Sequence, residues 1–367
     1  MPRHRSLNLK RFVDSIPQDL MGRYLVIAFG RINTLPSLDS ESIVDFLDKR
    51  ADPDLRNRIY EDFTHINDLG EKVMNILVKA VNKYGIETSG EETKQELAMH
   101  LFLNHREAFD YAYDHYCLFN SSSKISYHKV PPCALSMTEN KMKRFKQKIV
   151  EFYSNLAKGR ECLVRHYDEG DQIVIVVIHG SYRRSVSAWE KGNLNTLFYR
   201  PAKEDILQFD IKTSVLSIQA PYQKDKLNYI KAFTHTILEK EDDIDESERD
   251  ATYSLAPIQD GTFNFGGNET VTSVKLLEVK MSLRGSTNPD VMIRSSDVLE
   301  TFRNDVLGIN INSGDLVHAK FRFGLEVDGR FRKVTFEITP PNITNLTTKR
   351  YANIISAYLE ENGVKLI

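Results

Sequence analysis

The stretch AKFRFGLEVDGRFRKVTFEI, residues 319–338, decides the fold class of this chain. Apolar and polar residues alternate on both sides of Asp328-Gly329, and a period of two is typical of β-strands. The Asp-Gly dipeptide favours a two-residue turn of type I′, because both of its residues readily adopt positive φ. The sequence therefore predicts an antiparallel β-hairpin in the last third of the chain.

The two-residue turn also fixes the register of this hairpin. Counting outward from the turn places apolar residues opposite one another on one face, in the pairs Phe323–Val334, Phe321–Phe336 and Ala319–Ile338. The same register places Lys320 opposite Glu337 on the other face, which is a favourable cross-strand pair. The hairpin is thus predicted to direct one apolar face to a core and one charged face outward.

The charged face of the hairpin is a candidate binding surface. The cationic residues of this face, of the hairpin tip and of the following helix are Arg322, Arg330, Arg332, Lys333, Lys349 and Arg350. Arginine binds phosphate with two parallel hydrogen bonds, and a hairpin beside a helix can present such side chains to nucleic acid. Glu326 and Glu337 are predicted on the same face, so a solvated surface of mixed charge is the alternative interpretation.

Outward from the hairpin, the chain after residue 160 alternates between strand and helix patterns, whereas residues 1–159 have apolar spacings of three and four, typical of helices. One N-terminal stretch, RYLVIAFGRI at residues 23–32, fits a strand or a buried helix equally well. The predicted class is α+β: a helical N-terminal region followed by mixed, largely antiparallel β-sheet modules with packed helices. The predicted domains are a helical domain at 1–159, an α+β module at 160–250 that ends in an acidic linker from Glu239 to Asp250, and a C-terminal α+β module at 251–367.

A second candidate surface follows the apolar stretch IVIVVIHGSYRR, residues 173–184. Such an apolar run predicts a strand buried on both faces, with its end emerging from the core at a rim. The rim residues proposed for ligand or nucleic-acid binding are His179, Arg183, Arg184 and Arg200, because histidine can transfer protons and arginine can bind phosphate. A histidine that only forms a hydrogen bond at the strand end is the alternative.

Glu278-Val279-Lys280 indicates a catalytic alternative. A Glu-x-Lys pair on a strand can hold a divalent cation beside a lysine that activates water, as in a metal-dependent nuclease, with Asp210 as a further acidic ligand. Ordinary alternation of charge on a half-exposed strand explains the same residues without chemistry. The sequence contains no Walker-type phosphate loop, Gly-x-Ser-x-Gly, His-Glu-x-x-His or Cys-x-x-Cys motif.

The cysteines and histidines do not predict a metal site. Three cysteines form no disulfide framework and favour a reducing compartment, so a cytoplasmic location is expected. His115 and Cys117 lie two residues apart on a predicted helix, where side chains diverge, so neither zinc nor another cofactor is expected. No apolar run approaches the ~20 residues of a membrane helix, and no membrane contact is expected.

Charge composition shapes the functional prediction. Lys plus Arg number 49 against 51 Asp plus Glu, so any contact with a polyanion must come from a local patch. The predicted function is a non-catalytic binding or adaptor subunit of an intracellular assembly, with a protein partner and contact to nucleic acid or an acidic protein. A role in microbial DNA metabolism or anti-phage immunity would fit. The alternatives are the nuclease with Asp210, Glu278 and Lys280, and a small-ligand or nucleotide sensor at the His179 rim.

Overall fold

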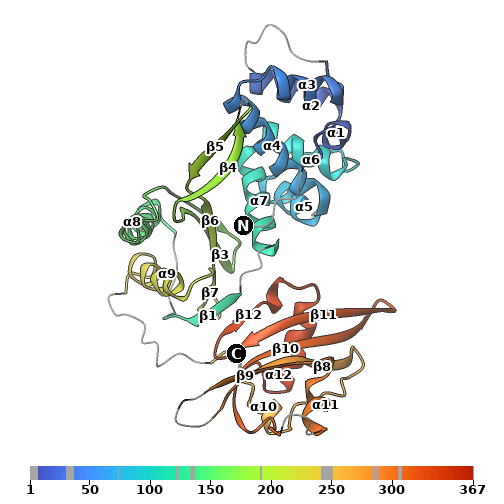
Figure 1. Ribbon diagram of the computed structural model, residues 1–367, viewed down its shortest axis with the longest axis vertical. Helices are drawn as coiled ribbons and strands as arrows, with labels where there is room; N and C mark the ends of the chain where they lie inside the picture. The colour runs from blue at the N-terminus through green and yellow to red at the C-terminus, as the bar shows by residue number, and fades with distance from the viewer. Residues whose placement is uncertain are drawn as a thin grey trace. The chain divides into compact units, whose positions relative to one another are not determined.

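The computed structural model describes residues 7–29, 37–72, 74–120, 124–132, 137–190, 192–240, 251–283, 287, 289–304 and 308–366 (Figure 1). The chain forms two compact units, Met1–Ser121 and Ser122–Ile367. The described part of the first unit is helical, and the second unit contains a ten-stranded sheet with packed helices. The predicted α+β class, a helical N-terminal region followed by antiparallel sheet, is confirmed.

Helices build the described part of the first unit, and the side chains of Asn8, Asp39 and Thr93 cap three of them. Its helices are α1 (Leu9–Asp14), α2 (Gln18–Phe29), α3 (Ser40–Lys49), α4 (Pro53–Lys72), α5 (Met74–Tyr84), α6 (Lys94–Asn104) and α7 (Arg106–Asn120). Thr93 caps α6 in a capping box, because its side chain accepts from the Glu96 amide while the Glu96 side chain accepts from the Thr93 amide. The ambiguous stretch at residues 23–32 contains the second half of α2, so its described residues are helical.

One continuous sheet organises the second unit. Its strand order is β2-β3-β6-β7-β1-β12-β11-β10-β8-β9, and neighbouring strands are antiparallel. The strands of this sheet are β1 (Ile125–Lys129), β2 (Cys162–Asp168), β3 (Gln172–Gly180), β6 (Ala202–Asp210), β7 (Val215–Gln219), β8 (Val271–Leu283), β9 (Asp290–Arg294), β10 (Gly314–Val327), β11 (Arg330–Thr339) and β12 (Ile343–Thr344). A separate two-stranded ribbon consists of β4 (Arg184–Glu190) and β5 (Asn193–Tyr199).

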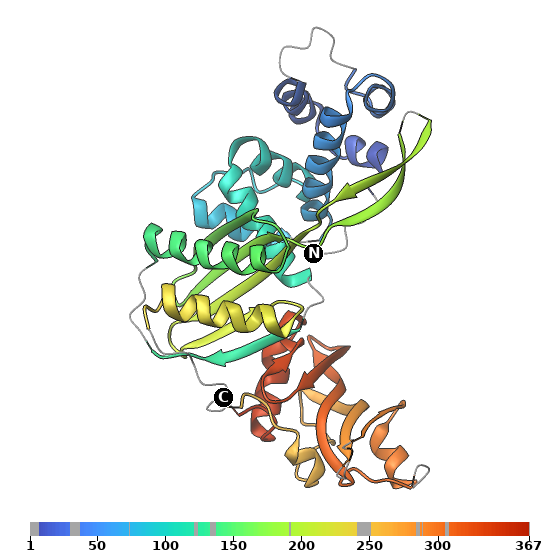
Figure 2. The ribbon, with the colours of Figure 1, turned by 60° about the vertical axis from the view of Figure 1, so that its left-hand side comes forward.

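Helices cover one face of each half of this sheet. The helices of the second unit are α8 (Glu139–Asn155), α9 (Gln223–Thr236), α10 (Ala256–Gln259), α11 (Val298–Arg303) and α12 (Ala352–Glu361), with a 3-10 turn at Leu346–Thr348. Figure 2 shows α8 and α9 side by side across the first half, where Phe145 and Phe233 join one core with Ile175. In the second half, Tyr358 of α12 and Val298 of α11 pack with the inner-facing side chains of β8, β10 and β11.

The predicted hairpin is confirmed residue by residue. Strands β10 and β11 pair with Phe321 opposite Phe336 and with Lys320 opposite Glu337. The turn residues Asp328 and Gly329 have φ of 53° and 65°, as a type I′ turn requires. The phenylalanines are fully buried, so the apolar face of the hairpin lies in the core and its charged face lies on the opposite side.

The division into units falls earlier than residue 159. Strand β1 pairs with β7 and β12, and α8 packs on the first half of the sheet, so residues 122–159 belong to the second unit. The modules predicted at 160–250 and 251–367 share the same ten-stranded sheet. Residues 241–250 of the predicted acidic linker lie outside the described residues.

Within the described ranges, no helix is both long enough and apolar enough to span a membrane.

Candidate functional site

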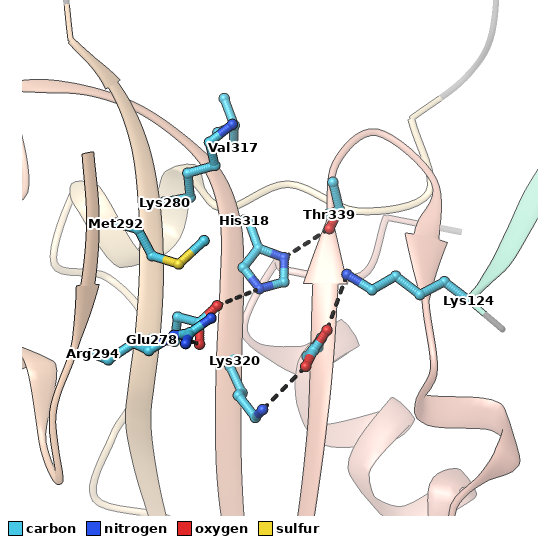
Figure 3. Close-up of a pocket in the computed structure, with 10 residues that line it drawn as sticks. Lys124, Glu278, Lys280, Met292, Arg294, Val317, His318, Lys320 and Thr339 are labelled. Carbon is cyan, nitrogen blue, oxygen red and sulfur yellow. Dashed lines mark hydrogen bonds and ion pairs between the residues drawn. The ribbon is translucent and has the colours of Figure 1, made fainter. Parts of the chain in front are cut away.

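The outer face of the second half of the sheet, opposite α10, α11 and α12, contains a hollow of about 700 Å³ (Figure 3). We use the term outer face for the side of β8, β9, β10 and β11 that carries Lys280, Arg294, Lys320 and Glu337. The charged side chains that line the hollow are Lys124, Lys280, Arg294, Lys320, Glu278 and Glu337. Four cationic groups thus accompany two carboxylates in one concave region.

Strand register brings these residues together. Residues directly opposite each other on antiparallel strands point to the same face of a sheet. Lys320 of β10 lies opposite Glu337 of β11 on one side and opposite Glu278 of β8 on the other. Glu278 in turn lies opposite Arg294 of β9. Neighbouring strands therefore contribute one charged side chain each to a row across the sheet, and Lys124 joins it from the segment before β1.

Glu337 binds two of the lysines. Its Oε2 lies 3.0 Å from Lys124 Nζ, and its Oε1 lies 3.2 Å from Lys320 Nζ. Burial alone would raise the Glu337 pKa, but the hydrogen bonds and charges of the two lysines outweigh it and hold the pKa below its ordinary value. Glu337 is therefore ionised at neutral pH, and it occupies the position between two ammonium groups that another anion could take.

Glu278 forms an ion pair with Arg294, the arginine that lines the hollow. Its Oε2 lies 2.6 Å from Arg294 Nε, and its Oε1 lies 3.5 Å from Nε2 of His318 (Figure 3). The other ring nitrogen of His318 is 2.8 Å from Thr339 Oγ1. Burial, followed by the charge of Lys124, lowers the His318 pKa, so this imidazole is neutral at pH 7. The positive charge of the hollow therefore comes from its lysines and its arginine.

The cationic side chains remain accessible to a ligand. The exposed fractions of the Arg294, Lys124 and Lys320 side chains are 69%, 40% and 34%. Lys280 forms an ion pair with Asp290, which lies on β9. The same face continues along β10 and β11 with Arg322 and Lys333. The Glu278 and Glu337 side chains are 10% and 22% exposed, so an incoming phosphate would have to compete with partly shielded carboxylates for these cations.

The structure separates the residues of the nuclease alternative. Asp210 ends β6, whereas Glu278 and Lys280 lie on β8, six strands away in the sheet. Six steps of about 4.8 Å amount to roughly 29 Å along the sheet. Asp210 instead accepts a hydrogen bond from the Thr213 amide. These three side chains do not converge on one metal ion.

His179 is not at an exposed rim. Its side chain is 3% exposed, with Nε2 3.0 Å from Asp205 Oδ2 and Nδ1 2.8 Å from the Gly180 carbonyl. Both ring nitrogens are therefore engaged. Arg183 and Arg184 are exposed as predicted, and a hollow of about 790 Å³ is lined by Arg183 and Arg200 together with His179. The expectation of an exposed histidine there is corrected, because the strand pair β3–β6 places a carboxylate against the ring.

Arg200 has a structural role at the base of the β4–β5 ribbon. Its guanidinium donates to the Ala157 carbonyl at 2.9 Å and to the Ser181 carbonyl at 2.7 Å. These bonds connect the segment after α8 to the end of β3. Arg200 is therefore already occupied, in contrast to its predicted partners Arg183 and Arg184.

The remaining predicted cations are distributed over both sides of the hairpin and the following helix. Arg332 lies opposite Leu325, on the inner side of the hairpin, and not on the outer face. Arg330 is exposed beside the turn. Lys349 is half-buried, and the Arg350 guanidinium lies 4.9 Å from the centroid of the Tyr351 ring. Of the predicted hairpin cations, Arg322 and Lys333 share the face that bears the hollow.

Comparison with known proteins adds no functional assignment. No protein-family model matches the chain, and no curated protein sequence matches it significantly.

Proposed function

We propose that the protein is a non-catalytic binding subunit that holds duplex nucleic acid by its phosphate groups at the outer face. The observation that carries this proposal is the convergence of Lys124, Lys280, Arg294 and Lys320 on one hollow. Lysine and arginine that neutralise phosphates release condensed counterions, and this release is a large part of nucleic-acid affinity. The chain as a whole has a net charge of -2, so such a local patch is what a polyanion would need.

The extent of the cationic row supports a polymeric anion. Alternate residues of a strand point to the same face and lie about 6.6 Å apart. Lys320 and Arg322 on β10 therefore form a row, and Lys275 of β8 lies directly opposite Arg322. A single small anion would use only part of this row, whereas a chain of phosphates can follow it.

The lining of the hollow supports a duplex over a single strand. Proteins that bind single strands usually stack the bases on aromatic rings. The ten residues that line the hollow include no Phe, Tyr or Trp, and their one imidazole, that of His318, is buried. Contacts at this face would therefore go to the sugar-phosphate backbone, which positions a protein on a duplex without reading its sequence.

Two single substitutions test the site with opposite signs. Lys320→Ala is expected to weaken binding to a short DNA duplex on the order of 5-fold and to reduce the salt slope by about 1. Glu337→Gln is expected to strengthen binding on the order of 3-fold, because it removes a carboxylate that competes for Lys124 and Lys320. Fluorescence anisotropy with a labelled duplex at several salt concentrations measures both effects.

The ligand series decides the class of partner. The same titration is repeated with duplex RNA, single-stranded DNA and polyglutamate. Binding of polyglutamate without binding of any nucleic acid would contradict the proposal and assign the outer face to an acidic protein. Equal weakening by Lys320→Ala and Glu337→Gln would also contradict it, since a general loss of structure, not a change in charge, would then explain the result.

A further inference from the structure

A buried polar cluster lies in the first half of the sheet, apart from the outer face. It consists of His179 at the end of β3, Asp205 on β6 and Asp225 in the first turn of α9. One ligand atom from each of these side chains lies within 4.8 Å of the others. The exposed fractions of the three residues are 3%, 1% and 2%. Three elements therefore direct one imidazole and two carboxylates into a closed space.

The two oxygens of Asp205 differ in their contacts. Oδ2 lies 2.9 Å from the Tyr229 hydroxyl, 3.2 Å from the Tyr153 hydroxyl and 3.0 Å from Nε2 of His179. Oδ1 is buried and has no hydrogen-bond partner. A buried carboxylate oxygen without a donor costs free energy, because it has lost its hydration without replacement. Asp205 therefore has a buried electron-pair donor that no hydrogen bond uses.

The hydrogen bonds of His179 define where a cation is needed. Its Nδ1 is 2.8 Å from the Gly180 carbonyl, which only accepts, so Nδ1 carries a proton. Nε2 and the Asp205 oxygen, 3.0 Å apart, then both present lone pairs unless a cation lies between them. Lys158 Nζ lies 3.3 Å from both oxygens of Asp225, and the buried Lys226 interacts electrostatically with Asp205. Neither lysine lies between Nε2 of His179 and the Asp205 oxygen, so that position is where a metal ion or a proton would lie.

We propose that His179, Asp205 and Asp225 form a buried site for a divalent transition metal of the zinc class. One imidazole nitrogen and two carboxylate oxygens suit zinc better than magnesium or calcium, which prefer larger shells of oxygen ligands. A ligating histidine commonly donates its other ring proton to a backbone carbonyl, as Nδ1 does to Gly180. Ligand bonds of about 2.1 Å at tetrahedral angles place the donor atoms about 3.4 Å apart, so the 4.8 Å span must close by roughly 1.4 Å when the metal binds.

Burial assigns this site a structural role. A catalytic metal keeps an open position for water or substrate, whereas structural sites are closed. These residues are at most 3% exposed, and of the three only His179 lines the hollow beside Arg183 and Arg200, so the two carboxylates are shielded from a phosphate or a peptide. The metal would connect β3, β6 and α9, which are the elements that carry its ligands. This role is independent of nucleic-acid binding at the outer face.

Wild-type protein provides the primary test. The protein is stripped with chelator, supplied with zinc chloride, dialysed and analysed for zinc. One equivalent per chain is expected, together with a melting temperature that rises with the logarithm of free zinc. Absence of retained zinc and an unchanged melting temperature would overturn the proposal and leave a proton on His179 as the balancing cation.

Matched variants locate the metal. His179→Gln and Asp225→Asn are each expected to lower zinc retention to well below one equivalent and to remove the zinc-dependent rise in melting temperature. Asp210→Asn, on the same strand as Asp205 but hydrogen-bonded at its far end, is expected to keep both. Cobalt supplies a second readout, since its visible absorption reports nitrogen and oxygen ligands directly. Zinc retained equally by all variants would place the metal elsewhere and contradict the proposal.

Discussion

Replacing Lys124, Lys280, Arg294 and Lys320 together by glutamine is expected to lower affinity for a DNA duplex at least about 10²-fold at low salt. The four side chains line one hollow, so each substitution removes a positive charge from the same contact region. The slope of log affinity against log salt should fall by about 3 to 4, because each neutralised phosphate contributes roughly 0.9 to it. Equilibrium binding at a series of salt concentrations measures both quantities.

A second cationic surface, on helix α8, provides the matched control. Helix α8 carries Lys143, Arg144, Lys146 and Lys148, all exposed and in the same unit. Replacing these four residues by glutamine removes the same formal charge but leaves the outer face intact. Little change is expected from this second variant. If it loses more affinity than the outer-face variant, nucleic acid binds at α8 and the proposed site is wrong.

Phe321→Ala is expected to destabilise the protein by about 3–5 kcal/mol. The Phe321 ring is fully buried, 5.4 Å from the centroid of Phe336 and 6.1 Å from that of Phe263. Its removal leaves a cavity where the hairpin meets the helices. Urea denaturation followed by circular dichroism gives the free energy of unfolding directly.

Phe331→Ala is the control for this change, since Phe331 lies on the same hairpin but is 56% exposed. It should alter the free energy of unfolding by no more than about 0.5 kcal/mol. Similar values for the two variants would show that the register of β10 and β11 is wrong. The inferred orientation of Lys320, and the set of residues assigned to the outer face, would then be wrong as well.

Local sequence signals predicted the parts of the fold that depend on neighbouring residues. The β10–β11 register follows from the Asp328-Gly329 turn, which is complete within a few residues. Strand β1 was missed because ISYHK stands between Ser-rich and Pro-rich segments, and its partners β7 and β12 lie roughly 90 and 220 residues further along the chain. The β4–β5 ribbon was also missed, because its strands pair only with each other and β5 is exposed along its whole length, so no core selects its apolar residues.

In the candidate site, too, the sequence predicted contacts between neighbouring residues but not contacts between distant strands. The Lys320–Glu337 pair could be predicted, because both residues belong to one hairpin. Arg294 and Lys124 could not, because their proximity depends on pairings between distant strands. His179 was expected at an exposed rim, yet Asp205 on the neighbouring strand β6, 26 residues later, places its Oδ2 3.0 Å from Nε2 of the imidazole. No local pattern encodes that contact.

Lysine footprinting tests the central claim most directly. The protein is treated with an amine-reactive reagent, with and without a saturating DNA duplex, and the modified peptides are quantified by mass spectrometry. Bound duplex is predicted to protect Lys124, Lys280 and Lys320, while Lys143 and Lys148 of α8 react equally in both samples. Protection of the α8 lysines with unchanged reactivity at Lys280 and Lys320 would contradict the assignment of nucleic-acid binding to the outer face.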